Sequence, residues 1–192
     1  MDTTPGSNLV PFTPSITTRR GQVASPPSLE SQPRLNPDAH RHWKANMSVE
    51  FLNKVNHIDI LETRTDENRT VFYVLQVHLP SQSVPVLTVE RRFSDFEELR
   101  HRLQSVLSDI PPCRCSFCYS LLAYLGFSKE QPRGIVKFIP NIDKRKKILA
   151  QFASDVVTMG RRRVEKAGKH ACEKQLLIPV ILQEFLVEKS GE

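Results

Sequence analysis

Residues 70–107 read TVFYVLQVHLPSQSVPVLTVERRFSDFEELRHRLQSVL, and the spacing of apolar side chains changes within them. Residues 70–79 and 86–93 are rich in β-branched and aromatic side chains, which favours two strands joined by a turn. Beyond them the apolar residues recur at helical spacing, after a capping box that begins at Ser94. The stretch therefore predicts a hairpin that leads directly into a helix over about residues 95–107.

The flanking sequence extends this pattern in both directions. Scattered β-forming residues over 49–61 predict a first strand, which makes a three-stranded antiparallel meander. Helical spacing predicts a second long helix over 142–159, and Pro179 predicts the start of a last helix that ends near Val187. A short helix is expected around 119–125. Strands followed by helices indicate an α+β fold, with the meander packed on a helical subdomain of three to four helices.

The N-terminal residues 1–46 differ in composition from the rest of the chain. They hold seven of the fourteen prolines, many Ser and Thr, and only isolated apolar residues. Such a segment buries too little surface to offset its ordering entropy, which predicts a disordered tail. We therefore expect one domain at 47–188 and a short C-terminal end at 189–192. We see no signal peptide and no apolar run near the ~20 residues that a membrane span needs.

The positive charge is concentrated in one part of the chain. The net charge is +6, and residues 129–174 carry thirteen Lys and Arg against five Asp and Glu. This favours an acidic partner, which is nucleic acid, anionic lipid or an acidic protein. The sharpest cluster is KRKK at 144–147, in the first turns of the second long helix, where free N–H groups bind anions. A solvated basic face is the alternative interpretation.

Arg91 and Arg92 lie at the end of the third strand, where binding residues concentrate. Consecutive residues of a strand point to opposite faces, so only one of the two faces a given site. We expect Arg91 to pair on the surface with a nearby carboxylate, such as that of Glu97 or Glu98.

Three cysteines, Cys113, Cys115 and Cys118, stand close together, and Cys172 follows far along the chain. Zinc takes four ligands, and the fourth would be Cys172 or His170. Either site requires the loop at 113–118 to fold onto residues 170–172. The alternative is reduced cysteines that pack as small apolar residues. We predict the alternative, with no metal and no other cofactor, because no complete zinc motif is present. Unpaired cysteines indicate a reducing compartment.

The block RRFSDF at 91–96, with Leu99 and Leu103, closely resembles the signature of the phox homology (PX) domain. Weaker similarities follow in the order of that family over about residues 47–188: the proline loop at 110–112, residues 138–139, the basic second helix at 145–152 and the closing helix at 181–187. The resemblance implies a three-stranded sheet against a helical subdomain. It also implies a pocket between them for a phosphoinositide, most often one with a 3-phosphate.

The resemblance assigns a role to each of several residues. It implies that Arg92 binds the 3-phosphate, that Phe93 covers the inositol ring, and that Arg145 binds the ring hydroxyls. Guanidinium groups suit this role because they make bidentate, charge-assisted bonds to phosphate. The proline loop of the family usually supplies a lysine for the 1-phosphate. Here Arg114 is the nearest cation, and Lys137 is the second choice.

These features predict a phosphoinositide-binding module that is cytoplasmic and peripheral on endosomal-type membranes. We expect Phe117 and Tyr119 to project toward the bilayer. We do not expect an enzyme, because the sequence contains no GxSxG, P-loop or kinase signature. The alternative is a PX-fold protein-interaction domain that has lost lipid binding, which the altered proline loop favours. Nucleic-acid binding rests on charge alone and ranks third, and the sequence indicates no particular protein partner.

Overall fold

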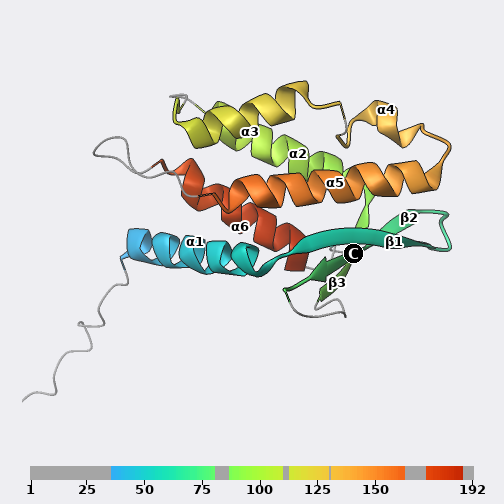
Figure 1. Cartoon of the computed structure of the whole chain (residues 1–192), viewed down its shortest axis with the longest axis horizontal. Helices are drawn as coiled ribbons and strands as arrows, with labels where there is room; N and C mark the ends of the chain where they lie inside the picture. Colours follow the sequence, from blue (N-terminus) through green and yellow to red (C-terminus); the bar gives the residue numbers. More distant parts are fainter. Residues whose placement is uncertain (1–35, 81–86, 110–112, 130, 163–171, 188–192) are drawn as a thin grey trace, which may run out of the picture. The chain divides into compact units, whose positions relative to one another are not determined.

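A computed structural model of the chain describes residues 36–80, 87–109, 113–129, 131–162 and 172–187 (Figure 1). The predicted C-terminal end at 189–192 lies outside these residues. The strands are β1 (His57–Thr65), β2 (Val71–His78) and β3 (Leu87–Arg92). The helices are α1 (Pro37–Lys54), α2 (Phe93–Ser108), α3 (Ser116–Phe127), α4 (Gly134–Lys137), α5 (Ile142–Gly160) and α6 (Lys174–Val187). The strands pair antiparallel in the order β1-β2-β3, which confirms the α+β fold and the meander.

The alternation of side chains along each strand puts one face of the sheet into the core. Ile60 pairs with Leu75, and Leu75 pairs with Val89, and all three side chains are buried. The register skips Leu61, which forms a β-bulge with an exposed side chain. The carbonyl of Leu61 accepts a hydrogen bond from Lys146 Nζ at 2.8 Å. Helix α5 therefore supports the bend that the bulge introduces into β1.

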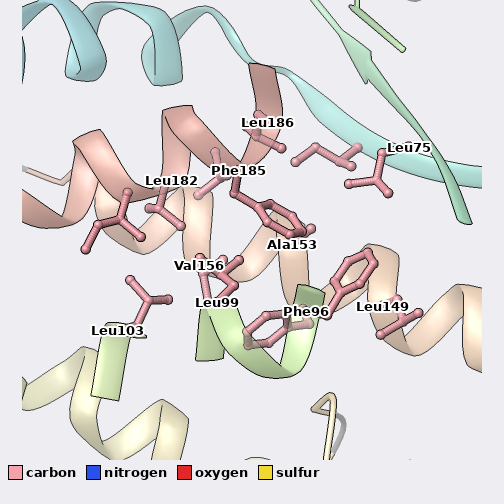
Figure 2. Close-up of a cluster of buried hydrophobic side chains, with 14 of the residues drawn as sticks. Leu75, Phe96, Leu99, Leu103, Leu149, Ala153, Val156, Leu182, Phe185 and Leu186 are labelled. Carbon is pink, nitrogen blue, oxygen red and sulfur yellow. The ribbon is translucent and has the colours of Figure 1, made fainter. Parts of the chain in front are cut away.

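Helices α2, α5 and α6 cover the apolar face of the sheet. Figure 2 shows their buried side chains in one cluster that has Leu75 of β2 at its edge: Phe96, Leu99 and Leu103 from α2, Leu149, Ala153 and Val156 from α5, and Leu182, Phe185 and Leu186 from α6. Helices α5 and α6 approach closely at Gly160, where a Cβ atom would overlap the side chain of Leu182. The predicted helices over 95–107 and 142–159 are confirmed to within two residues at each end.

Arg91 of β3 is buried in this core although it carries a charge. The residue is only 4% exposed. Its Nε and Nη2 atoms donate to the carbonyl of Phe185 at 2.9 and 2.7 Å, and Nη2 also lies 3.4 Å from the carbonyl of Glu184. The last carbonyls of a helix have no partner within the helix, so Arg91 caps the end of α6. The predicted surface pairing with Glu97 or Glu98 is wrong, because strand alternation turns Arg91 inward.

Residues 37–46, which composition placed in the disordered tail, form the first half of α1. The helix begins with a proline at its first position, and the side chain of Asn36 accepts a hydrogen bond from the Asp38 N–H at 3.0 Å. Both features are typical of a helix start. Helix α1 packs against α6 and buries Ala45 completely. The domain therefore includes ten more residues than predicted, and residues 1–35 of the predicted tail lie outside the described residues.

Three other elements differ in length from the prediction. Strand β1 begins at His57 rather than near residue 49, because α1 continues to Lys54. Helix α3 covers residues 116–127 and is longer than the short helix expected there. Helix α6 begins at Lys174, so Pro179 lies inside the helix and not at its start. Proline lacks the N–H that the helix needs, but its ring is buried here, and packing outweighs the lost bond.

Replacing Arg91 with Leu should lower the free energy of unfolding by about 2–3 kcal/mol, since it leaves buried carbonyls of α6 without a donor. The matched control is Arg92→Gln, which changes the neighbouring arginine on the other face and should cost less than about 0.5 kcal/mol. Urea denaturation of the full chain measures both values. Equal losses for the two variants would show that Arg91 does not hold α6 on the sheet.

Candidate functional site

The arginines of the predicted site lie where α2 and α5 begin. Figure 1 shows both helices starting over the sheet, whereas α3 and α6 start at the other end of the helices. Two sites of different chemistry are therefore separated along the length of α5. The first contains Arg92 and Arg145, and the second contains the cysteines.

Arg92 is the last residue of β3 and the N-cap of α2. Its backbone N–H donates to the carboxylate of Asp95 at 2.8 Å, and its Nε atom lies 3.5 Å from the same carboxylate. Asp95 therefore caps the start of α2, and the capping box predicted at Ser94 is wrong. The Arg92 side chain is 47% exposed. Ion pairs this exposed contribute little to stability, so the guanidinium can exchange Asp95 for an anion from solution.

Arg145 lies in the first turns of α5 and is half-buried. Its Nη1 atom lies 3.4 Å from the carbonyl of Lys137, the last residue of α4. Lys146 turns toward the sheet instead, and its ammonium group lies 2.7 Å from the carboxylate of Asp143. The hydrogen bond and the charge of Lys146 lower the pKa of Asp143. Among the cations at 144–147, Arg145 is thus the one held against α4.

Tyr73 of β2 contacts the first turn of α2 and lies near Arg145. It pairs across the sheet with Arg91, the neighbour of Arg92, and its ring meets the ring of Phe96 edge-on at a centroid distance of 6.3 Å. Tyr73 is 1% exposed. Burial raises the pKa of its phenol, and the nearby positive charge of Arg145 partly offsets that rise. The phenol of β2, the first turns of α2 and the start of α5 therefore meet at one point.

Two buried donor atoms at this point have no hydrogen-bond partner in the described part of the chain. They are the hydroxyl of Tyr73 and Nε of Arg145. Buried polar atoms are nearly always hydrogen-bonded, and leaving one without a partner costs about 1–3 kcal/mol. Nε of arginine can only donate, and a phenol can donate too, so an acceptor would satisfy both atoms. Next to guanidinium groups, the acceptor that binds best is an anion.

Helix α4 lies next to Arg145 and the start of α2. A Cβ atom added at Gly134 would lie 4.0 Å from the carboxylate of Glu97, which places the start of α4 against α2. The loop before α4 is held by the buried side chain of Gln131. This side chain accepts a hydrogen bond from Arg100 Nε at 2.9 Å and donates to the carbonyl of Tyr124. No pattern in the sequence indicates this role, because a single glutamine in a polar loop resembles any surface residue.

The two cations considered for a second phosphate differ in position. Lys137 is exposed on α4, and its carbonyl contacts Arg145. Arg114 precedes α3, whose Ser116 lines a cavity together with Met159 near the end of α5. Met159 lies roughly 21 Å beyond Arg145, at a rise of 1.5 Å per residue. The structure therefore does not bring Arg114 to the arginine site, and Lys137 is the cation beside it.

The apolar residues near the site also differ from the prediction. Phe93 is buried in the core and offers little surface to a sugar ring. Phe117, expected to project, is buried on the inner face of α3, whereas Tyr119 is exposed as expected. The exposed apolar residues beside Arg145 are instead Ile135 and Phe138, at 78% and 81% exposure. The sequence IVKF at 135–138 does not show which of its apolar residues are exposed.

The structure brings the four cysteines together. Their sulfur atoms all lie within 4.8 Å of one another. Cys113, Cys115 and Cys118 come from the start of α3, and Cys172 precedes α6. The condition for a four-cysteine group, that the distant cysteine folds onto the loop, is met. His170, the alternative fourth ligand, lies outside the described residues.

No protein-family model, no curated protein and no solved structure matches the chain. The assignment of both sites therefore depends on the geometry of this chain alone. In the part of the chain that the structure describes, no helix has the length and apolar character required to cross a bilayer.

Replacing Tyr73 with Phe should leave the free energy of unfolding unchanged or raise it by about 1 kcal/mol, because the buried hydroxyl has no partner in the ligand-free chain. The control is Tyr124→Phe, which removes a hydroxyl that donates to Asp155 at 2.9 Å and should cost about 1 kcal/mol. Urea denaturation separates the two outcomes. A loss at Tyr73 as large as that at Tyr124 would mean that the Tyr73 hydroxyl is already satisfied.

Proposed function

We propose that this chain is a phosphoinositide-binding module of PX type, with the headgroup bound where β2, β3, α2, α4 and α5 meet. The observation that carries the proposal is the pair of buried donors without a partner, the Tyr73 hydroxyl and Arg145 Nε. Arg92 begins α2, whose Phe96 contacts the ring of Tyr73, and its exposed guanidinium forms an ion pair with Asp95. A phosphorylated polyol supplies both an anion and neutral hydroxyl acceptors.

Each group has a distinct task in this proposal. Arg92 leaves Asp95 and binds the 3-phosphate, because a phosphate dianion carries more charge than the carboxylate and offers more acceptor oxygens to the guanidinium. Arg145 Nε and the Tyr73 hydroxyl bind the oxygens of the inositol ring. Lys137 lies beside Arg145 and takes the 1-phosphate, the role for which the cysteine loop supplies no cation.

The membrane contact is proposed to be α4 and its flanks. Ile135 and Phe138 are exposed on either side of the buried Val136, and the charge of Lys137 lies between them. Arg133 holds this segment to the end of α3 through a hydrogen bond to the carbonyl of Gly126 at 2.8 Å. Apolar side chains flanked by cations suit the boundary of an anionic bilayer. Recruitment to endosomal-type membranes follows from a preference for the 3-phosphate.

The first test measures binding of the full chain to vesicles that contain phosphatidylinositol 3-phosphate, at physiological salt. The wild type should bind, and Arg92→Gln and Arg145→Gln should each weaken binding tenfold or more, since each removes charge-assisted bonds worth about 1.5–3 kcal/mol. The matched control is Arg64→Gln, which removes the same charge from an exposed arginine that pairs with Glu90 on the sheet. This control should bind within about twofold of the wild type.

Two results would overturn the proposal. If the wild type does not bind these vesicles, the proposed function is wrong, and a PX-fold protein-interaction domain becomes the leading alternative. If all three arginine variants bind equally well, the attraction is due to net charge and not to the site.

The second test separates the headgroup site from the membrane contact. Phe138→Asp should weaken vesicle binding tenfold or more, since burying a phenylalanine side chain contributes about 1.5–3 kcal/mol. It should leave binding of the soluble headgroup, inositol 1,3-bisphosphate, unchanged by calorimetry. Tyr119→Asp is the control. Tyr119 is similarly exposed, but it lies in the first turn of α3, next to the cysteines and away from α4. Equal losses for both variants would rule out α4 as the membrane contact.

A further inference from the structure

The four-cysteine group joins two segments that are far apart in the sequence. Cys113 and Cys172 are 59 residues apart, and their sulfur atoms lie 3.4 Å from each other. The sulfur atom of Cys118 lies 3.4 Å from that of Cys172 as well. The start of α3 is thus held to the start of α6 by a contact between sulfur atoms.

The spacing of the sulfur atoms fits a metal ion better than it fits the two alternatives. A disulfide has its sulfur atoms about 2.05 Å apart, and the four thiols are free. Cysteines that pack as apolar residues contact carbon neighbours on all sides, whereas these four sulfur atoms all lie within 4.8 Å of one another. Four sulfur atoms placed tetrahedrally about 2.3 Å from Zn²⁺ lie about 3.8 Å from each other.

The backbone around the cysteines favours thiolates. Cys115 is the N-cap of α3, and its sulfur atom accepts the N–H of Cys118 at 3.5 Å. Oxygen side chains usually fill this position, and a thiolate accepts such a bond better than a neutral thiol. Cys172 stands just before α6, so the positive ends of two helix dipoles face the group.

The thiols of the group differ in acidity. Burial raises the pKa of Cys115, but hydrogen bonds from the Cys118 N–H and from the neighbouring thiols lower it more, to about 7. Burial raises the pKa of both Cys118 and Cys172. The positions of the four sulfur atoms, and not their acidity, therefore indicate a metal site.

We propose that Cys113, Cys115, Cys118 and Cys172 bind one structural Zn²⁺ ion that fastens the start of α3 to the start of α6. Thiolate ligands in a tetrahedral set of four select Zn²⁺ or iron, and a closed set of four leaves no position for catalysis. A cavity of about 240 Å³, lined by Cys113 and Cys172 among others, opens beside the group and gives the ion access. The site is independent of the headgroup site, which lies at the other end of α5.

The primary test is metal analysis of the full chain, expressed with zinc in the medium and purified under reducing conditions without chelator. The wild type should contain about one zinc ion per chain. Cys118→Ser and Cys172→Ser should each contain less than about 0.2, and each should melt roughly 10 °C or more below the wild type. Ser120→Ala, on the exposed side of the same helix, is the control and should keep the zinc and the melting temperature.

A second measurement does not depend on whether the serine variants fold. The wild-type chain, stripped of metal and kept under anaerobic and reducing conditions, is titrated with Co²⁺. Uptake of one ion should give the visible bands of tetrahedral Co²⁺ and the near-ultraviolet charge-transfer band of Co²⁺–thiolate bonds, and Zn²⁺ should then displace it.

Three results would overturn the proposal. The first is a wild-type chain that contains less than about 0.2 zinc and takes up no Co²⁺. The second is freshly purified protein whose intact mass under denaturing conditions shows the loss of two hydrogen atoms, which identifies a disulfide. The third is a coloured protein that contains iron and no zinc.

Discussion

The hydrogen bonds between the Arg91 guanidinium and the last carbonyls of α6 determine how the sheet and the helices fit together. Because β3 alternates, burying Arg91 turns Arg92 to the opposite face at the point where α2 begins. A slip of one residue in the register would exchange the two arginines and expose the apolar residues of β3. Burial of Arg91 thus sets the side of β3 on which Arg92 of the candidate site lies. The packing of α6 in the core depends on the same hydrogen bonds of Arg91.

The strands and helices with strong periodicity could be predicted from the sequence, and the others could not. Helices α2 and α5 carry large apolar side chains at helical spacing. Helix α1 buries only two large apolar residues, Val49 and Leu52, beside Ala45 and Ser48, so its apolar stripe is weak and hard to detect. Its start was nevertheless marked by Asn36 and the proline that follows. The start of α6 was missed because proline is common at the first position of a helix. Here Pro179 lies within the helix, where α6 packs against α1 and α2.

Arg92 was named from the local motif RRFSDF, and Arg145 from the weaker resemblance of the basic second helix; their binding role stays a prediction. Tyr73 could not be named, because it stands out only through a buried hydroxyl that lacks a hydrogen-bond partner. Whether a hydroxyl finds a partner depends on which groups surround it in the folded chain. The cysteines show the same limit. Three of them are close together in the sequence. The fourth, Cys172, comes near them only because α6 packs against the other helices, and residues other than cysteine make those contacts. The position of Arg114 could not be predicted for the same reason. The start of α3, which Arg114 precedes, lies near the end of α5 and far from Arg145.

The separation of the two sites along α5 has an electrostatic consequence. A zinc ion with four thiolates carries two more negative than positive charges, and such a group would repel a phosphorylated ligand at short range. Arg145 and Met159, near the two ends of α5, are roughly 21 Å apart at 1.5 Å per residue. That distance exceeds two Debye lengths of about 8 Å at physiological ionic strength, so salt screens the repulsion through solvent. The proposed metal cluster and the proposed anion site thus lie near opposite ends of α5, where the first would not weaken the second.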